Sequence, residues 1–147
     1  MFDRQAFIEL ITDHVESPRH YGRMADATVS MTYGNPGCGD LITVFLKLDE
    51  NERVTDVSFV DENPTHDNPN QSCSVSRGAT SILTEMVIGK TLGEIAALDS
   101  QEFVDEIGGH SVAATRPKCI TLGVSAMKAA EKRYRFQQQQ EQNQQNG

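Results

Sequence analysis

The sequence predicts an α+β fold in which a small three-stranded antiparallel sheet is packed on one face by helices. Three observations lead to this prediction. An amphipathic segment opens the chain, alternating apolar segments occupy residues 28–60, and helical periodicity dominates from residue 75 onward. A block of strands followed by a block of helices is typical of an antiparallel sheet whose helices are segregated to one face.

The opening segment is predicted to be a helix capped by Asp3 and ended near Pro18. Four residues at helical spacing share its apolar face: Phe7, Leu10, Ile11 and His14. On such a face His14 is interpreted as a packed or surface residue rather than as a metal ligand. His20, in the polar loop that follows, is expected to be solvated.

Three strands are predicted in the next part of the chain. They span residues 28–32, Leu41–Leu48 and Val54–Val60, and a polar turn at residues 49–52 joins the last two. In the second strand every other residue from Ile42 onward is apolar, which is the pattern of a strand with one buried face.

Helices are predicted for most of the second half. An amphipathic helix follows a polar loop at residues 61–72 and ends at Gly89, and two short helices precede a last helix at about residues 120–136. Residues 137–147 include seven glutamines and are predicted to be a disordered tail. The expected organisation is therefore one domain, residues 1–136, followed by this tail.

Composition narrows the possible function classes. The formal charge of -8 argues against nucleic acid as a partner, because phosphate binding needs a basic patch. No apolar run approaches the roughly 20 residues of a membrane helix, and the first residues lack signal-peptide character. We therefore expect a cytoplasmic protein that does not bind membranes and whose cysteines stay reduced.

Three cysteines and one carboxylate are the candidate functional residues. Cys38 lies in a glycine-rich turn two residues before Asp40, whereas Cys73 and Cys119 each lie at a predicted helix start. Unpaired N–H groups and the helix dipole stabilise a thiolate there. Three thiolates and one carboxylate complete a four-coordinate metal site. Because the cysteine spacing matches no zinc finger, separate buried thiols stay open as the alternative, and His110 stays open as another ligand.

The chain resembles the IscU/SufU-type iron–sulfur cluster assembly proteins, which are related to the N-terminal domain of NifU. Four motifs carry the resemblance: HVESPRHYG at residues 14–22, NPGCGD at 35–40, CSVS at 73–76 and RPKCITL at 116–122. It covers residues 2–136 and implies a SufE/IscU-like sandwich.

The resemblance implies a scaffold that accepts persulfide sulfur from a pyridoxal-phosphate cysteine desulfurase. Such proteins build a transient Fe–S cluster and deliver it to downstream acceptor or carrier proteins. Cys38, Asp40, Cys73 and Cys119 would be the ligands, holding Zn²⁺ in the cluster-free form. Cys119 would accept sulfur in the IscU branch, and Cys38 in the SufU branch.

Several positions depart from the family pattern. Lys118 stands where IscU-type proteins have His, as in the SufU branch, yet the chain lacks the SufU insertion. Lys118 and Arg116, beside the third cysteine, are the expected supporting residues. Arg77 stands where a small or apolar residue is common, and the loop at residues 61–71 is longer than in either branch.

Two further functions stay open at the level of sequence. One is a zinc-dependent sulfurtransferase that stimulates a desulfurase without building a cluster, which Lys118 favours. The other is a purely structural zinc domain. A hydrolytic zinc enzyme is not favoured, because four protein ligands leave no position for water. A scaffold or sulfur relay is therefore expected rather than an enzyme with its own turnover.

Overall fold

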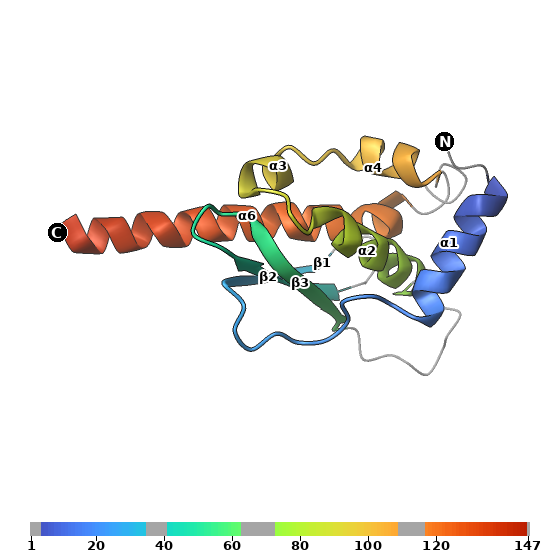
Figure 1. The fold of residues 1–147 in the computed structure, drawn as a ribbon, viewed down its shortest axis with the longest axis horizontal. Helices are drawn as coiled ribbons and strands as arrows, with labels where there is room; N and C mark the ends of the chain where they lie inside the picture. The colour runs from blue at the N-terminus through green and yellow to red at the C-terminus, as the bar shows by residue number, and fades with distance from the viewer. Residues whose placement is uncertain (1–3, 35–40, 63–72, 109–116, 147) are drawn as a thin grey trace.

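The computed structural model describes residues 4–34, 41–62, 73–108 and 117–146, except for the side chains at 4, 73–75, 117–119 and 142–146 (Figure 1). The elements in chain order are α1 (Arg4–Glu16), β1 (Val29–Gly34), β2 (Leu41–Leu48), β3 (Val54–Asp61), α2 (Cys73–Val87), α3 (Leu92–Ala96), α4 (Ser100–Ile107) and α6 (Pro117–Asn146). This is the predicted α+β fold.

The sheet is antiparallel with the order β1-β2-β3. Thr43 of the central strand pairs with Thr32 on one side and Val60 on the other. The predicted inward face of β2 is confirmed, because Ile42, Val44 and Leu46 belong to the hydrophobic core cluster. Thr43 and Phe45, on the opposite face, are also buried but lie outside that cluster. Alternation with period 2 therefore identified the face that meets the helices.

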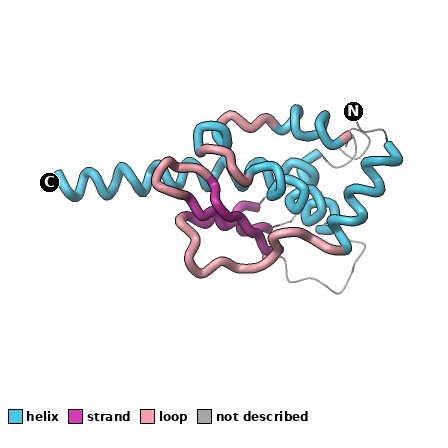
Figure 2. The backbone as a smooth tube through the Cα atoms, in the orientation of Figure 1, coloured by secondary structure: helices cyan, strands magenta, loops and turns pink. Residues whose placement is uncertain are grey.

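Helices α2 and α6 cover this face of the sheet. α6 packs across β1 and β2, α2 packs on β3, and α1 lies against the outer side of α2. In Figure 2 the helices gather on the upper side of the strands. None of the helices in the described part of the chain is long and apolar enough to cross a membrane.

Two glycines let the three long helices approach closely. A Cβ on Gly78 of α2 would lie 2.7 Å from Val15 Cγ2 of α1. A Cβ on Gly123 of α6 would lie 2.7 Å from Thr80 Oγ1 of α2. Glycine at these points lets side chains of the neighbouring helix rest against the backbone.

The end of the chain differs from the sequence-based expectation. Helix α6 continues through Asn146, so residues 137–146 are helical, and the separation of a domain at residues 1–136 from a tail stays a prediction. The expected domain boundary at residue 136 falls within this helix, which projects beyond the rest of the molecule (Figure 1). Glutamine is a good helix former, and extending an existing helix avoids the cost of nucleation.

Candidate functional site

The four predicted ligands come from three segments that the structure describes to different extents. Cys38 and Asp40 lie outside the described residues. Cys73 is the first residue of α2 and Cys119 is the third residue of α6. For these two cysteines the backbone is described and the side chain is not, so the site is located through the elements that flank it.

The side chains of the supporting residues and the alternative ligand predicted from the sequence are not described by the structure either. Arg116 and His110 lie outside the described residues, as does the side chain of Lys118. Within the described ranges, no group of three or more His, Cys, Asp or Glu side chains is placed to hold a metal ion. The predicted ligand set therefore stays a prediction.

The loop of residues 35–40, which carries two of the predicted ligands, is anchored at one end of the sheet. Gly34 and Leu41, the residues that flank it, are paired at the end of the β1–β2 hairpin. The N–H of Glu62, just after β3, donates to the Leu41 carbonyl at 2.9 Å. The loop thus begins and ends beside the C-terminal end of β3.

Helix α2 begins at this same end of the sheet. In its second turn, an Arg77 guanidinium nitrogen lies 3.5 Å from Asp61 Oδ2, at the end of β3. Beyond its last turn, the Gly89 N–H donates to the Val54 carbonyl at 2.9 Å, at the start of β3. α2 therefore runs antiparallel to β3, with its N-terminus toward the anchors of the 35–40 loop.

Helix α6 runs in the same direction as α2. Near its start Gly123 meets Thr80, in the middle of α2. Farther along, Arg135 lies 3.8 Å from Glu52 in the β2–β3 turn, at the opposite end of the sheet. At 1.5 Å per residue, Thr80 is about 10 Å along the axis from the first residue of α2, and Gly123 about 6 Å from the third residue of α6. Both N-termini therefore point toward the anchors of the 35–40 loop.

The local chemistry at these helix starts favours thiolates. Cys73 and Cys119 both lie in the first turn of a long helix, and neither first turn contains an acidic residue. Free N–H groups and the positive end of the dipole stabilise a thiolate there. A donor set of three thiolates and one carboxylate suits Zn²⁺ or iron.

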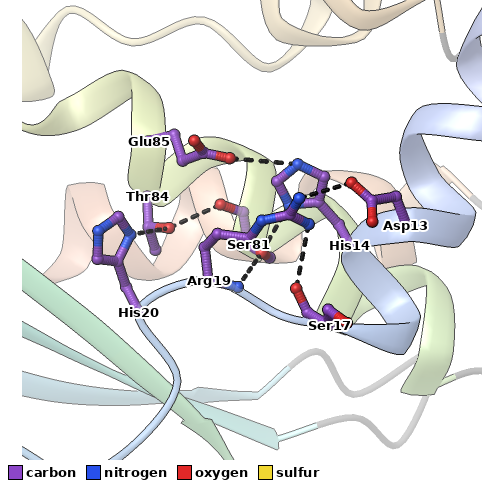
Figure 3. A network of polar contacts seen from close by, with 8 residues as sticks. All are labelled: Asp13, His14, Ser17, Arg19, His20, Ser81, Thr84 and Glu85. Carbon is purple, nitrogen blue, oxygen red and sulfur yellow. Dashed lines mark hydrogen bonds and ion pairs between the residues drawn. The ribbon is translucent and has the colours of Figure 1, made fainter.

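A polar network fastens the segment after α1 to the middle of α2 (Figure 3). At its centre Ser81 Oγ accepts from the Arg19 N–H at 2.7 Å and lies 2.7 Å from His14 Nδ1. The Arg19 guanidinium in turn lies 2.6 Å from the Asp13 carboxylate and donates to the Ser17 carbonyl. These contacts hold α2 against α1 and so help to fix the helix that carries the second cysteine.

The hydrogen bonds around His14, which is 3% exposed, indicate which of its ring nitrogens carries a proton. Because Ser81 accepts from Arg19, its O–H is free to donate to His14 Nδ1, and His14 Nε2–H then donates to Glu85 Oε1 at 3.2 Å. Burial lowers the pKa of His14 and the Arg19 charge acts in the same direction, while Glu85 and Asp13 oppose them. His14 is thus a neutral hub of the network.

The sequence-based interpretation of His20 was wrong. His20 is half-buried, and its Nδ1 lies 3.0 Å from Thr84 Oγ1. Since the Thr84 O–H donates to the Ser81 carbonyl, His20 must donate through Nδ1–H. One signal could have indicated this role: Ser81, Thr84 and Glu85 form a polar stripe at i, i+3 and i+4 on an amphipathic helix.

Comparison with known proteins identifies the family. The sequence matches the family model described as "NifU-like N terminal domain" over residues 6–141. The chain belongs to this family. The predicted kinship is therefore confirmed, and so is the fold that it implied.

Relatives in this family are named for cluster assembly. The chain is 30% identical over 143 residues to the "Iron-sulfur cluster assembly scaffold protein IscU" of Streptococcus pyogenes, covering 86% of this chain and 83% of that protein. It is 29% identical over 136 residues to the protein of the same name in Haemophilus influenzae, covering 90% and 98%.

A solved structure supports the fold independently. A protein from Fervidobacterium islandicum, described as a candidate iron–sulfur cluster assembly scaffold for the SUF system, superposes with a TM-score of 0.64. The match covers 84% of this chain and 94% of that one at 22% identity. The two chains therefore share this arrangement of sheet and helices.

Proposed function

We propose that this protein is an iron–sulfur cluster assembly scaffold that accepts sulfur from a cysteine desulfurase. Relatives named as such scaffolds align with most of the chain. The observation that carries the proposal is geometric: the segments bearing Cys38, Cys73 and Cys119 all start or end at one end of the sheet. This shared location supports a site in which the three distant cysteines act together.

Sulfur is transferred by exchange between a thiolate of this chain and a persulfide of the desulfurase. The acceptor thiolate of Cys119 or Cys38 attacks the outer sulfur of a persulfide on the desulfurase. The S–S bond of that persulfide breaks, the desulfurase thiolate leaves, and the new persulfide sits on this chain. A positive helix end favours the attacking thiolate, which suits Cys119 in the first turn of α6.

Iron and sulfide are the cargo of the site. Cys38, Asp40, Cys73 and Cys119 are the proposed ligands of the nascent cluster. Releasing sulfide from a persulfide takes two electrons, which an external thiol or a reduced electron carrier supplies. The finished cluster then passes to acceptor proteins, so the site must also be able to release the cluster.

In the cluster-free protein the same four residues would hold Zn²⁺, which keeps the three thiolates charged. Asp40 is the hard, weakly held member of this soft donor set. Its carboxylate is therefore the ligand that we expect to exchange first. We also propose that the protein is located in the cytoplasm.

A second candidate function deserves a direct test because Lys118 replaces the histidine of IscU-type proteins. In this alternative the protein is a zinc-dependent sulfurtransferase that speeds desulfurase turnover and builds no cluster. Zinc-bound Cys38 is then the thiolate that exchanges with the persulfide of the desulfurase.

Anaerobic reconstitution separates the two candidates. The full chain is mixed with Fe²⁺, cysteine, dithiothreitol and a catalytic amount of a cysteine desulfurase, and absorbance is followed between 320 and 600 nm on the order of an hour, the working scale of slow thiol exchange. For a scaffold we expect a visible cluster band that is lost in the variants Cys38→Ser, Cys73→Ser and Cys119→Ser.

The sulfurtransferase alternative predicts the opposite pattern. No band forms in the wild type, while sulfide release by the desulfurase rises. A band that persists in all three variants would contradict the proposed ligand set, and circular dichroism shows whether each variant stays folded.

A further inference from the structure

Arg77 is a cation in the second turn of α2 whose hydrogen-bonding capacity is incompletely used. Its Nε is buried and has no hydrogen-bond partner among the described residues. One guanidinium nitrogen lies 3.5 Å from Asp61 Oδ2, at the outer limit of a hydrogen bond, and the guanidinium carbon lies 5.8 Å from the Tyr21 ring centroid. A buried guanidinium N–H without an acceptor is costly, so it calls for a partner.

The position of Arg77 indicates where that partner lies. Positions 73 and 77 are four residues apart on α2 and therefore share one face of the helix. Long side chains on a helix lean toward its N-terminus. The guanidinium is thus held at the end of the sheet where the cysteine-bearing segments are anchored.

The charge of a loaded site supplies the reason for a cation there. In the metal-free site three protonated thiols and one carboxylate carry a net charge of about −1, and binding of a divalent ion releases the three thiol protons and leaves a net charge of about −2. Loading therefore adds one negative charge to the site. The chain itself carries a formal charge of -8, which adds to the repulsion. An arginine is suited to offset this because it stays protonated at every physiological pH.

We propose that Arg77 is a charge-compensating residue of the site, which stabilises its metal-loaded form by donating to the negatively charged ligand shell. Asp61 and Tyr21 hold the guanidinium in place from the sheet side. The inference rests on the proposed function, because it takes the three-cysteine site as its target.

The test measures Zn²⁺ affinity of the purified full chain by competition with a chromophoric chelator. We expect Arg77→Met to weaken Zn²⁺ binding by about tenfold, the size of one unit charge acting at roughly 10 Å in a partly aqueous medium. Arg77→Lys, which keeps the charge, recovers most of the loss. Lys47→Met removes the same charge from an exposed ion pair with Asp26 and should leave the affinity unchanged.

Asp61→Asn distinguishes compensation of charge from mere anchoring of α2. It removes the ion pair and keeps the arginine, so we expect Zn²⁺ affinity to stay the same or to rise. Equal losses in Asp61→Asn and Arg77→Met would overturn the proposal, as would an unchanged affinity in Arg77→Met. Melting of the metal-free variants reports any loss of folding separately.

The same measurements distinguish a failure of the proposed three-cysteine site from a failure of the role proposed for Arg77. If the wild type does not bind one Zn²⁺ per chain, or if the Cys→Ser variants bind it as well as the wild type, the site itself is wrong and this inference falls with it. If the wild type binds one Zn²⁺ through its cysteines and Arg77→Met binds it equally well, only the role of Arg77 is refuted.

Discussion

A single hydroxyl, that of Ser81, joins two stretches of chain that are far apart in sequence. Its oxygen accepts from the Arg19 backbone and its proton goes to the buried imidazole of His14. Removing this donor or this acceptor would leave a buried polar group unpaired, at a cost of about 1–3 kcal/mol. The conformation after α1 therefore depends on the neutral form of one histidine.

This dependence predicts a loss of stability in mild acid. Burial holds the pKa of folded His14 below its ordinary value, so the unfolded chain takes up the proton first. The contribution of His14 is complete above about pH 6.5 and is lost as the pH falls below that value toward the folded-state pKa. Each pKa unit of difference corresponds to about 1.4 kcal/mol of unfolding free energy.

The measurement is urea unfolding of wild type and His14→Gln at pH 7.5, 6.5 and 5.5. The amide can still hydrogen-bond but does not titrate, so the variant should lose less stability between the two extremes of pH. Carboxylates titrate in both proteins and cancel in the comparison. A variant that loses as much stability as the wild type would show that His14 is not the titrating group.

Helices α6 and α2 pack closely at Gly123 of α6 and Thr80 of α2. A Cβ at position 123 would approach Thr80 Oγ1 to 2.7 Å and both Thr80 Cβ and Cγ2 to 3.2 Å. Threonine is stiff at χ1, so it cannot simply swing away. Alanine at 123 would gain about 1 kcal/mol of helix propensity, but the overlap costs about 1–3 kcal/mol.

We therefore predict that Gly123→Ala lowers the free energy of unfolding by about 1 kcal/mol, measured by urea unfolding at pH 7.5. Thr80→Ala removes two of the three clashing atoms, together with a buried hydroxyl that lacks a partner within the described residues. The double variant should accordingly be more stable than the two single changes predict when added. If the changes in unfolding free energy of the two single variants simply add in the double variant, the two residues do not interact sterically.

Sequence patterns predicted the helices and strands well where the interactions that form them involve residues close in sequence. The alternation of Ile42, Val44 and Leu46 depends only on the period of a strand. Composition alone did not predict the helix at the glutamine-rich end, because it describes an isolated segment and that segment continues an existing helix.

Contacts between distant segments could not be read from the sequence. The bond between His14 and Ser81 joins residues 67 apart, and the one between His20 and Thr84 joins residues 64 apart. Only packing decides which polar stripe meets which histidine. For the same reason the cysteine spacing could suggest a common site but could not establish one.

At the scale of the whole molecule, the fold brings the cysteine-bearing segments toward one end of the sheet. The hairpin end formed by Gly34 and Leu41 lies beside the end of β3, and α2 and α6 both start toward it. The opposite end holds the β2–β3 turn and the contact between Glu52 and Arg135. The proposed site would therefore lie at the end of the sheet away from the β2–β3 turn.

Zinc K-edge X-ray absorption of the zinc-loaded full chain tests this arrangement most directly. We predict a first shell of three sulfur atoms at about 2.3 Å and one oxygen at about 2.0–2.2 Å. Each Cys→Ser variant should lose one sulfur from that shell. A wild-type shell with fewer than three sulfur atoms, or one made of nitrogen and oxygen alone, would contradict a shared site for Cys38, Cys73 and Cys119.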